Sequence, residues 1–184
     1  SSSISITASS VVGIDLSREM LRRARQRLAG HAHVHLILAD MRSLRLARRF
    51  DLVVAANDPF VHLLKDTDRD RALETVADHL ESAGGRFVLD AFWLEDDRLE
   101  QAARPGGYRR ERTLEADEIS RPNPLRIQET WHCDQESRRC RVRYEYVPQD
   151  DGESGDSSPR DRAVFDARLW SVQELEARLG RVGL

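Results

Sequence analysis

The amino-acid sequence predicts an α/β protein: an open parallel sheet with helices on both faces, followed by a small inserted antiparallel sheet. Four apolar runs, at 11–15, 33–39, 50–56 and 86–92, lack alternation, as strands buried on both faces do. A helical segment lies between the first and second runs, and another lies between the third and fourth. Beyond Phe92 the sequence changes to partly alternating stretches between turn-rich segments, which indicates antiparallel strands.

The first apolar run ends on Asp15 and leads directly into a helix. Ser17 is a good N-cap, and Gly30 is placed to end this helix. The apolar residues of the segment recur on one helical face: Met20, Leu21, Ala24 and Leu28. The second run also ends on an acid, Asp40, so two carboxylates stand at the carboxyl ends of neighbouring strands, where ligands of parallel sheets bind.

The second helix follows a break after the third run. Pro59 cannot donate a hydrogen bond to a strand ladder, and residues 61–64 predict one helical turn. We expect Asp66 or Thr67 to cap the longer helix that follows and Gly84 to end it. One face of this helix is apolar, with Ala72, Leu73, Val76, Ala77 and Leu80.

The C-terminal half predicts a lid. A short helix over 95–104 is expected first, and the spacing of Ser171 and Glu174 predicts a capping box at the start of a last helix. The expected antiparallel strands between them are 108–114, 125–133, 140–147 and 163–170. The expected organisation has three parts: a core over 1–94, an inserted antiparallel lid over 95–170, and a returning helix over 171–184.

Composition excludes several classes of partner. The net charge of -3 gives no electrostatic case for binding nucleic acid or an anionic membrane. No apolar run approaches the roughly 18 residues of a membrane span. The two cysteines, Cys133 and Cys140, face each other across a predicted hairpin, and we interpret them as packed thiols in a cytoplasmic, reducing environment rather than, with His132, as metal ligands.

The same segments resemble a known family. The stretches GIDLSREML at 13–21, ADM at 39–41, FDLVV at 50–54 and GGRFVLD at 84–90 follow in the order and at the spacing of class I S-adenosylmethionine-dependent methyltransferases. The resemblance covers about 11–92 and continues more loosely beyond. It implies a Rossmann-like fold, S-adenosyl-L-methionine as cofactor, and methyl transfer to a small-molecule acceptor.

The resemblance also implies roles for the residues after the first two strands. In the family the acid at the position of Asp15 binds the ribose hydroxyls, which suits a strand-end carboxylate because it can accept two hydrogen bonds from a diol. Asp40 matches the acid that accepts from the adenine amino group, and Met41 matches the residue whose backbone N–H binds adenine. Leu16 and Met20 are expected to form apolar walls beside the adenosine. In the competing interpretation the two acids only start a helix and cap a turn.

Donor and acceptor meet after the third strand in this family. Asn57 is a candidate for cofactor binding and catalysis, and His62 is a candidate general base because its unperturbed pKa is near neutrality. Asp58 and Phe60 are candidate acceptor contacts, since Asn-Asp-Pro-Phe resembles the Asn-Pro-Pro-Phe motif of amino-methyltransferases, from which it departs at Asp58. An ordinary turn is the favoured alternative for this segment.

Trp93 and Tyr108 are expected to line the mouth of the pocket under the lid, either stacking on the acceptor or closing the core. His31, His33 and His35 share one strand face, but no acidic or sulfur ligand joins them at metal-binding spacing. We therefore predict no metal site.

Two other functions remain open from the sequence: a non-catalytic nucleotide-binding or scaffold protein, and an NAD-dependent oxidoreductase. The family's glycine-rich loop, which holds the methionine part of the cofactor, has no counterpart, because residues 1–10 contain no glycine. Ile4 and Ile6 alternate with polar residues, which is typical of a strand and of a disordered segment alike. We therefore expect either that the family's central first strand lies upstream of these residues or that this serine stretch stands in for poorly defined chain, and we expect the family's last strands beyond Leu184.

Overall fold

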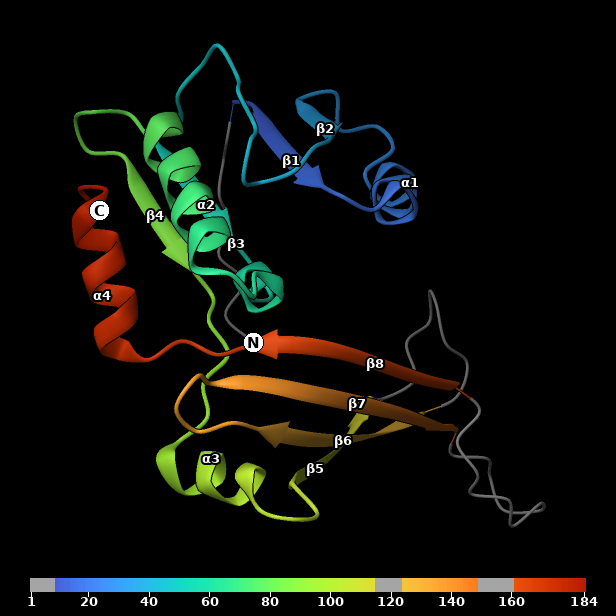
Figure 1. Ribbon diagram of the computed structural model, residues 1–184. Helices are drawn as coiled ribbons and strands as arrows, with labels where there is room; N and C mark the ends of the chain where they lie inside the picture. The colour runs from blue at the N-terminus through green and yellow to red at the C-terminus, as the bar shows by residue number, and fades with distance from the viewer. Residues whose placement is uncertain (1–8, 115–123, 149–160) are drawn as a thin grey trace.

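The computed structural model describes residues 9–114, 124–148 and 161–184 (Figure 1). The elements in chain order are β1 (Val11–Asp15), α1 (Arg18–Arg27), β2 (Val34–Leu38), β3 (Leu52–Ala55), the 3-10 helix η1 (Pro59–His62), α2 (Asp66–His79), β4 (Arg86–Leu89), α3 (Asp96–Ala103), β5 (Tyr108–Leu114), β6 (Leu125–Cys133), β7 (Arg139–Pro148), β8 (Asp161–Arg168) and α4 (Val172–Arg181). The parallel strands lie on one side of the molecule and the antiparallel sheet on the other (Figure 1). The stretch with Ile4 and Ile6 lies outside the described residues.

The four predicted parallel strands form as two separate pairs. β1 pairs with β2, and β3 pairs with β4. Within the described ranges, no strand is hydrogen-bonded between β1 and β3. The separation falls where the resemblance leads us to expect the family's central first strand. The arrowheads of β1 and β4 point toward the side where the antiparallel sheet lies (Figure 1).

Helix α1 begins where the sequence predicts. The Ser17 hydroxyl accepts a hydrogen bond from the Met20 N–H at 3.2 Å. The Leu28 N–H donates to the Ala24 carbonyl and closes the last turn. Leu21 is buried, and α1 packs on both β1 and β2. This helix therefore covers the first strand pair.

Helix α2 has a different N-cap from the predicted one. Lys65 occupies the cap position in extended backbone and makes no side-chain capping bond. Capping by Asp66 or Thr67 is therefore wrong. The Asp66 carboxylate instead accepts hydrogen bonds from Arg168 and Arg178, which lie about a hundred positions further along the chain. The acid still lies in the first turn, where the helix dipole favours it.

Helices α2 and α4 share one core with the β3–β4 pair. Its fully buried members are Phe60, Ala72, Leu73 and Trp170. Helix α4 adds Leu175, Leu179 and Val182. It begins as predicted, with the Glu174 N–H donating to the Ser171 hydroxyl at 3.0 Å. On the other face of the strand pair, Val54 and Val88 are exposed.

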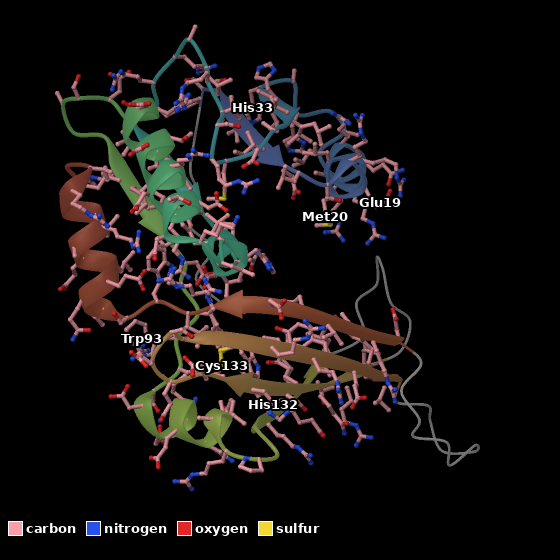
Figure 2. All side chains as sticks on the ribbon, viewed as in Figure 1. Glu19, Met20, His33, Trp93, His132 and Cys133 are labelled. Atoms are coloured by element: carbon pink, nitrogen blue, oxygen red, sulfur yellow. A yellow bond between two sulfur atoms is a disulfide. The ribbon has the colours of Figure 1, made fainter. Side chains whose placement is uncertain are left out.

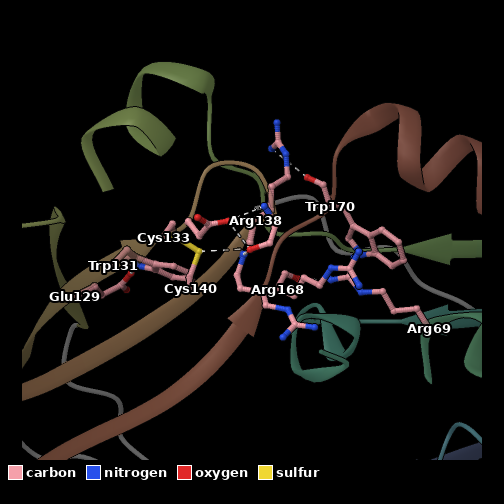
Figure 3. The surroundings of a disulfide bond; sticks show 11 residues. Arg69, Glu129, Trp131, Cys133, Arg138, Cys140, Arg168 and Trp170 are labelled. Carbon is pink, nitrogen blue, oxygen red and sulfur yellow. Dashed lines mark hydrogen bonds between the residues drawn. A yellow bond between two sulfur atoms is a disulfide. The ribbon is translucent and has the colours of Figure 1, made fainter. Parts of the chain in front are cut away.

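A buried arginine joins α2 to the segment that leads into α4. The Arg69 side chain has no solvent exposure, and its guanidinium carbon lies 3.8 Å from the Trp170 ring centroid (Figure 3). Its Nε donates to the Leu63 carbonyl at 3.0 Å, and its Nη1 lies 3.4 Å from Glu174 Oε1. Burial lowers the pKa of Arg69 to about 10, so the side chain stays charged at neutral pH.

The antiparallel sheet has the strand order β5-β6-β7-β8. All four predicted strands are confirmed, and β5 and β6 match to the residue. Helix α3 and η1 pack on this sheet, which buries Trp131 and Val142 in a common core with Val61 and Leu99. We call this face, which carries Trp131, the inner face of the lid.

Cys133 and Cys140 form a disulfide between β6 and β7 (Figure 3). The two residues are direct partners in the strand register, and their Cα atoms lie 4.0 Å apart. The prediction of two free thiols is therefore wrong, because the hairpin register brings both sulfurs to one place. Because the two cysteines are paired, they no longer support the inference that the protein works in a reducing compartment.

Candidate functional site

Asp15 ends β1 on the side of the strands that faces the lid. Its carboxylate Oδ1 accepts a hydrogen bond from the Ser17 N–H at 2.7 Å, which holds the side chain at the strand-to-helix junction. Two large apolar side chains beside it are unusually open to solvent: Leu16 is 66% exposed and Met20 is 53% exposed. Figure 2 shows Met20 projecting from α1 toward the lid side. A carboxylate next to uncovered apolar side chains fits the ribose and adenine of an adenosine group.

Asp40 follows β2 and is held by Arg42. The Arg42 Nε lies 3.0 Å from both carboxylate oxygens, Nη2 donates to Oδ2 at 2.6 Å, and the Arg42 backbone N–H donates to Oδ1. The Arg42 guanidinium beside Asp40 lowers the pKa of that carboxyl. Arg42 also bonds Asp68 of α2 at 3.0 Å. Met41 is half-buried against the α2–α4 core. An adenine amino group could bond Asp40 only if the Arg42 guanidinium gave up some of its hydrogen bonds to the carboxylate. The binding of adenine by Asp40 stays a prediction.

Asn57 and Asp58 form a strained turn after β3. Both have positive φ, 59° and 44°, in the left-handed region that few residues other than Gly, Asn and Asp adopt readily. The Asn57 N–H donates to Asp90 Oδ2 at 3.1 Å. Asp58 is buried, with Oδ1 accepting from the Val61 N–H at 3.1 Å and Oδ2 from the Phe92 N–H at 2.7 Å. Burial raises the pKa of the Asp58 carboxyl, while the two backbone bonds act in the opposite direction.

Asp58 and Phe60, the candidate acceptor contacts, both make contacts inside the fold. Both oxygens of Asp58 already accept backbone hydrogen bonds inside the fold. Phe60 has no solvent exposure, and its ring lies 5.9 Å from Trp170 and 6.4 Å from Phe87, between centroids. Both side chains are buried, and their expected contact with an acceptor stays a prediction.

His62 ends η1 and is exposed. Its ring packs against Phe165 of β8 with 5.4 Å between centroids, so the candidate base lies where the turn after β3 meets the inner face of the lid. Asn57 and His62 are thus carried by one continuous segment, which Asp58 caps.

Trp93 and Tyr108 lie apart from His62. Trp93 is exposed on the segment between β4 and α3, and Figure 2 shows it at the hairpin end of the lid. Tyr108 belongs to β5, three strands from the Phe165 that His62 touches, or about 14 Å at the usual strand spacing. Its ring is half-buried and lies under Arg98. Their expected place at the pocket mouth is untested and stays a prediction.

The candidate residues form two groups. Asp15, Leu16, Met20, Asp40 and Met41 follow the first strand pair, and Asn57 and His62 follow β3. Two residues of the candidate site were not predicted from the sequence. Arg42 forms an ion pair with the Asp40 carboxylate, and Asp90 accepts a hydrogen bond from the Asn57 backbone N–H. Asp90 carried a signal, because it directly follows the apolar residues 87–89, much as Asp15 and Asp40 follow apolar residues.

Other features lie outside these groups. In the parts of the chain that the structure describes, no three His, Cys, Asp or Glu side chains gather as metal ligands would. None of the described helices is long and apolar enough to cross a membrane. A polar hollow of about 510 Å³ lies between the start of α2, the β6–β7 hairpin and the start of α4. Ion pairs of Arg168 with Asp66 and Glu174 line it, so its charges are already matched.

Comparison with known proteins gives a consistent result. Residues 3–84 match the family described as a methyltransferase domain. A curated relative from Streptomyces venezuelae, dTDP-3-amino-3,4,6-trideoxy-alpha-D-glucopyranose N,N-dimethyltransferase, is 36% identical over 84 residues, which are 46% of this chain and 34% of that protein. The chain therefore spans about a third of the length of this relative.

Solved structures share the fold over nearly the whole chain. DesVI from Streptomyces venezuelae matches with a TM-score of 0.68 and 25% identity, over 94% of this chain and 65% of DesVI. CalS10 from Micromonospora echinaspora, described as a SAM-bound amino pentose methyltransferase, matches with a TM-score of 0.69 and 23% identity, over 95% of this chain and 65% of CalS10. The resemblance to class I S-adenosylmethionine-dependent methyltransferases is therefore confirmed, over residues 3–84 by the methyltransferase-domain family and over the described strands and helices by the fold.

Proposed function

We propose that this protein uses S-adenosyl-L-methionine to methylate the amino group of a small molecule, a sugar carried on a nucleotide. The observation that carries the cofactor assignment is Asp15, a strand-end carboxylate beside the exposed Leu16 and Met20, inside the segment that matches the methyltransferase domain. The acceptor is supported by the relatives, one of which is named for a dTDP-linked amino sugar and another described as acting on an amino pentose. The net charge of -3 argues against a nucleic-acid acceptor.

Each cofactor-binding residue has a separate part of the adenosine. Asp15 accepts hydrogen bonds from the ribose hydroxyls, and Leu16 and Met20 cover the flat adenine with apolar surface that is otherwise exposed. Asp40 and the Met41 backbone recognise the adenine edge, with Arg42 giving way at Asp40. Asn57 stands at the carboxyl end of β3, where the methyl group is presented.

Methyl transfer asks the protein mainly for position and the exclusion of water. When bound, the cofactor would supply a methyl group from its sulfonium to the acceptor nitrogen, and the sulfur would keep the electron pair of the bond that breaks. Asn57 orients the amine, and His62, at the end of the same segment, takes the proton that the nitrogen loses.

Calorimetry tests the cofactor assignment. We expect S-adenosyl-L-methionine to bind and NAD not to bind, and Asp15→Ala to weaken binding by about 1.5–3 kcal/mol, the range for hydrogen bonds to a charged group. The matched control is Asp51→Ala, an exposed acid at the opposite end of a parallel strand, which should keep wild-type affinity. Unchanged affinity in Asp15→Ala, or a preference for NAD, would refute the assignment.

A pH–rate profile tests His62. His62→Gln is expected to lower the methylation rate by about a hundredfold, with little change in cofactor affinity, because general-base catalysis contributes on that scale. His132→Gln, at an exposed histidine of the lid, is the control and should keep the wild-type profile. Retention of the wild-type rate by His62→Gln would remove this residue from the mechanism.

A further inference from the structure

We propose that the inner face of the lid binds the phosphate-bearing nucleoside of the acceptor, with Arg110 and Arg112 holding the diphosphate and Tyr146 stacking on the base. The inference rests on the proposed function for the presence of an acceptor between the strands and the lid. The residues themselves follow from the geometry of the lid.

A row of aromatic side chains leads from the candidate methyl-transfer position into the lid. The His62 ring packs on Phe165, and Phe165 meets Tyr144 edge to face, each pair with 5.4 Å between centroids. Tyr144 meets Tyr146 edge to face at 6.4 Å. Tyr144 and Tyr146 are two positions apart on β7, so they share the inner face with Val142. The row therefore extends along the lid from the segment that carries Asn57 and His62.

A buried carboxylate holds an arginine next to this row. Glu129, the strand partner of Tyr144, is only 3% exposed. Its Oε1 accepts from Arg112 Nε at 2.8 Å, and its Oε2 lies 3.4 Å from Trp131 Nε1 (Figure 3 shows Glu129 and Trp131). The terminal nitrogens of Arg112 lie outside this bond. A buried acid that orients the Nε of an arginine presents its guanidinium in a fixed direction.

Arg110 completes the cationic part of the inner face. It is the strand partner of Glu129 and is exposed. Burial, together with the neighbouring Glu129, raises the pKa of Tyr144, and Arg112 and Arg110 act against this rise, so both cations lie near that phenol.

Of the residues that the structure describes, two arginines and one buried acid carry charge at the β5–β6 side of the inner face, so the cations outnumber the acid there. The other described charged residue that the register places on this face is Asp161, beside Tyr146 on β8. It stands three strands from β5, about 14 Å away at the usual spacing. The positive charge therefore lies on one side of the aromatic row rather than along all of it.

This arrangement suits a nucleoside diphosphate better than a neutral sugar alone. Guanidinium groups recognise phosphate oxygens through paired hydrogen bonds. A half-exposed tyrosine can stack on any base because stacking needs only a flat face.

Titration calorimetry with thymidine diphosphate, thymidine and inorganic pyrophosphate tests the inference. We expect thymidine diphosphate to bind in a salt-sensitive manner and thymidine to bind at least about tenfold more weakly. Arg110→Gln and Arg112→Gln should each weaken thymidine diphosphate by about tenfold. Tyr146→Leu should weaken thymidine diphosphate but not pyrophosphate.

Two further variants make the test specific to this face. Arg109→Gln removes an exposed arginine from the neighbouring position of β5, which faces the other side of the sheet, and should leave binding unchanged. Glu129→Gln keeps the size of the side chain but weakens the bond that orients the Arg112 guanidinium, so it should weaken thymidine diphosphate binding several-fold. Loss of binding that is equal in Arg109→Gln and Arg110→Gln, or unchanged binding in a folded Glu129→Gln, would overturn the proposal.

The same samples separate this inference from the proposed function. If S-adenosyl-L-methionine binds but thymidine diphosphate does not, the lid site is wrong and the methyltransferase assignment stands. If neither ligand binds to folded wild-type protein, both proposals fail. If pyrophosphate binds as tightly as thymidine diphosphate and Tyr146→Leu has no effect, the face is a phosphate site without base recognition, and the nucleoside part of the proposal is overturned.

Discussion

The carboxylate of Asp58 accepts a hydrogen bond from the Phe92 backbone N–H at 2.7 Å, and so ties the turn after β3 to the segment after β4. A second bond, from the Asn57 N–H to Asp90 Oδ2, runs between the same two segments, so each supplies one acid. Adjacent carboxyl ends of the parallel strands are thereby held together at the place where the candidate catalytic residues Asn57 and His62 begin.

Asp58→Asn is expected to lower the free energy of unfolding by about 1–3 kcal/mol. Asparagine has one acceptor oxygen, so it can satisfy the N–H of Val61 or that of Phe92, but not both. Asp90→Asn, at an exposed acid that accepts one backbone hydrogen bond, is the matched control and should lower the free energy of unfolding by less. Urea denaturation measures both values, and equal stability of Asp58→Asn and wild type would contradict the bridging role.

The pH dependence of that cost has a definite sign. Burial raises the pKa of Asp58 in the folded protein above its usual 3.8, so the folded state binds more protons than the unfolded state in the window above 3.8. The contribution of Asp58 to stability is therefore full below that value and declines as pH rises through the folded pKa. We expect the stability difference between wild type and Asp58→Asn to narrow as pH rises from 3.8. Urea denaturation at a series of pH values measures this difference, and a widening with pH would contradict the prediction.

Arg42→Gln is expected to tighten S-adenosyl-L-methionine binding by about twofold to fivefold. The guanidinium now occupies both oxygens of Asp40, and breaking such a partly exposed ion pair costs about 0.2–1 kcal/mol. Arg45→Gln, at a nearby arginine that bonds the Leu44 carbonyl instead, should leave affinity unchanged. Calorimetry measures the affinity of both variants for S-adenosyl-L-methionine, and weaker binding in Arg42→Gln would contradict the binding of adenine by Asp40.

Arg69→Met is expected to destabilise the protein by about 3–5 kcal/mol, because it removes a fully buried cation from among its acceptors. The stacking on Trp170 is lost with it. Arg71→Met, on the exposed side of the same helix, should change stability by no more than about 0.5 kcal/mol. Thermal unfolding followed by circular dichroism compares the two, and similar values would mean that the buried bonds of Arg69 contribute little.

The disulfide gives a further prediction. Replacing both Cys133 and Cys140 with alanine is expected to lower the free energy of unfolding by about 2–3 kcal/mol, the chain-entropy value for so short a loop. Adding a dithiol reductant to the wild type should produce a similar loss, and the double variant should not respond to it. A wild type that is insensitive to reductant would show that the bridge is not formed in solution.

Local pattern predicted much of the fold. The bounds of β5 and β6 follow from partial alternation and from the turn-rich segments that separate them, and the Ser17 and Ser171 caps follow from hydroxyls placed before amphipathic runs. Such features depend on neighbours within a few positions, so the sequence displays them directly.

Long-range partners decided what the sequence could not show. Asp66 stands where an N-cap is expected, but its carboxylate accepts a hydrogen bond from Arg178, near the far end of the chain. Phe60 after a proline looks the same whether it faces a ligand or, as here, a core completed by Trp170. The register that sets Cys133 opposite Cys140 was predicted, but the bond between the two sulfurs was not. Asp40 was identified as a site residue, but its pairing with Arg42 was not.

The separation of the β1–β2 pair from the β3–β4 pair has a consequence for how the molecule opens. Strands β1 and β2 form their backbone hydrogen bonds with each other, and α1 packs on both. Among the described residues, few hydrogen bonds join this unit to the rest of the chain; one is that of the Arg48 side chain with Ser10 at 3.4 Å. Amide hydrogens of this unit should therefore exchange with deuterium faster than those of β3 and β4, as one cooperative group. A cofactor that spans from Asp15 to Asn57 would join the two units, so its binding should slow exchange in both at once.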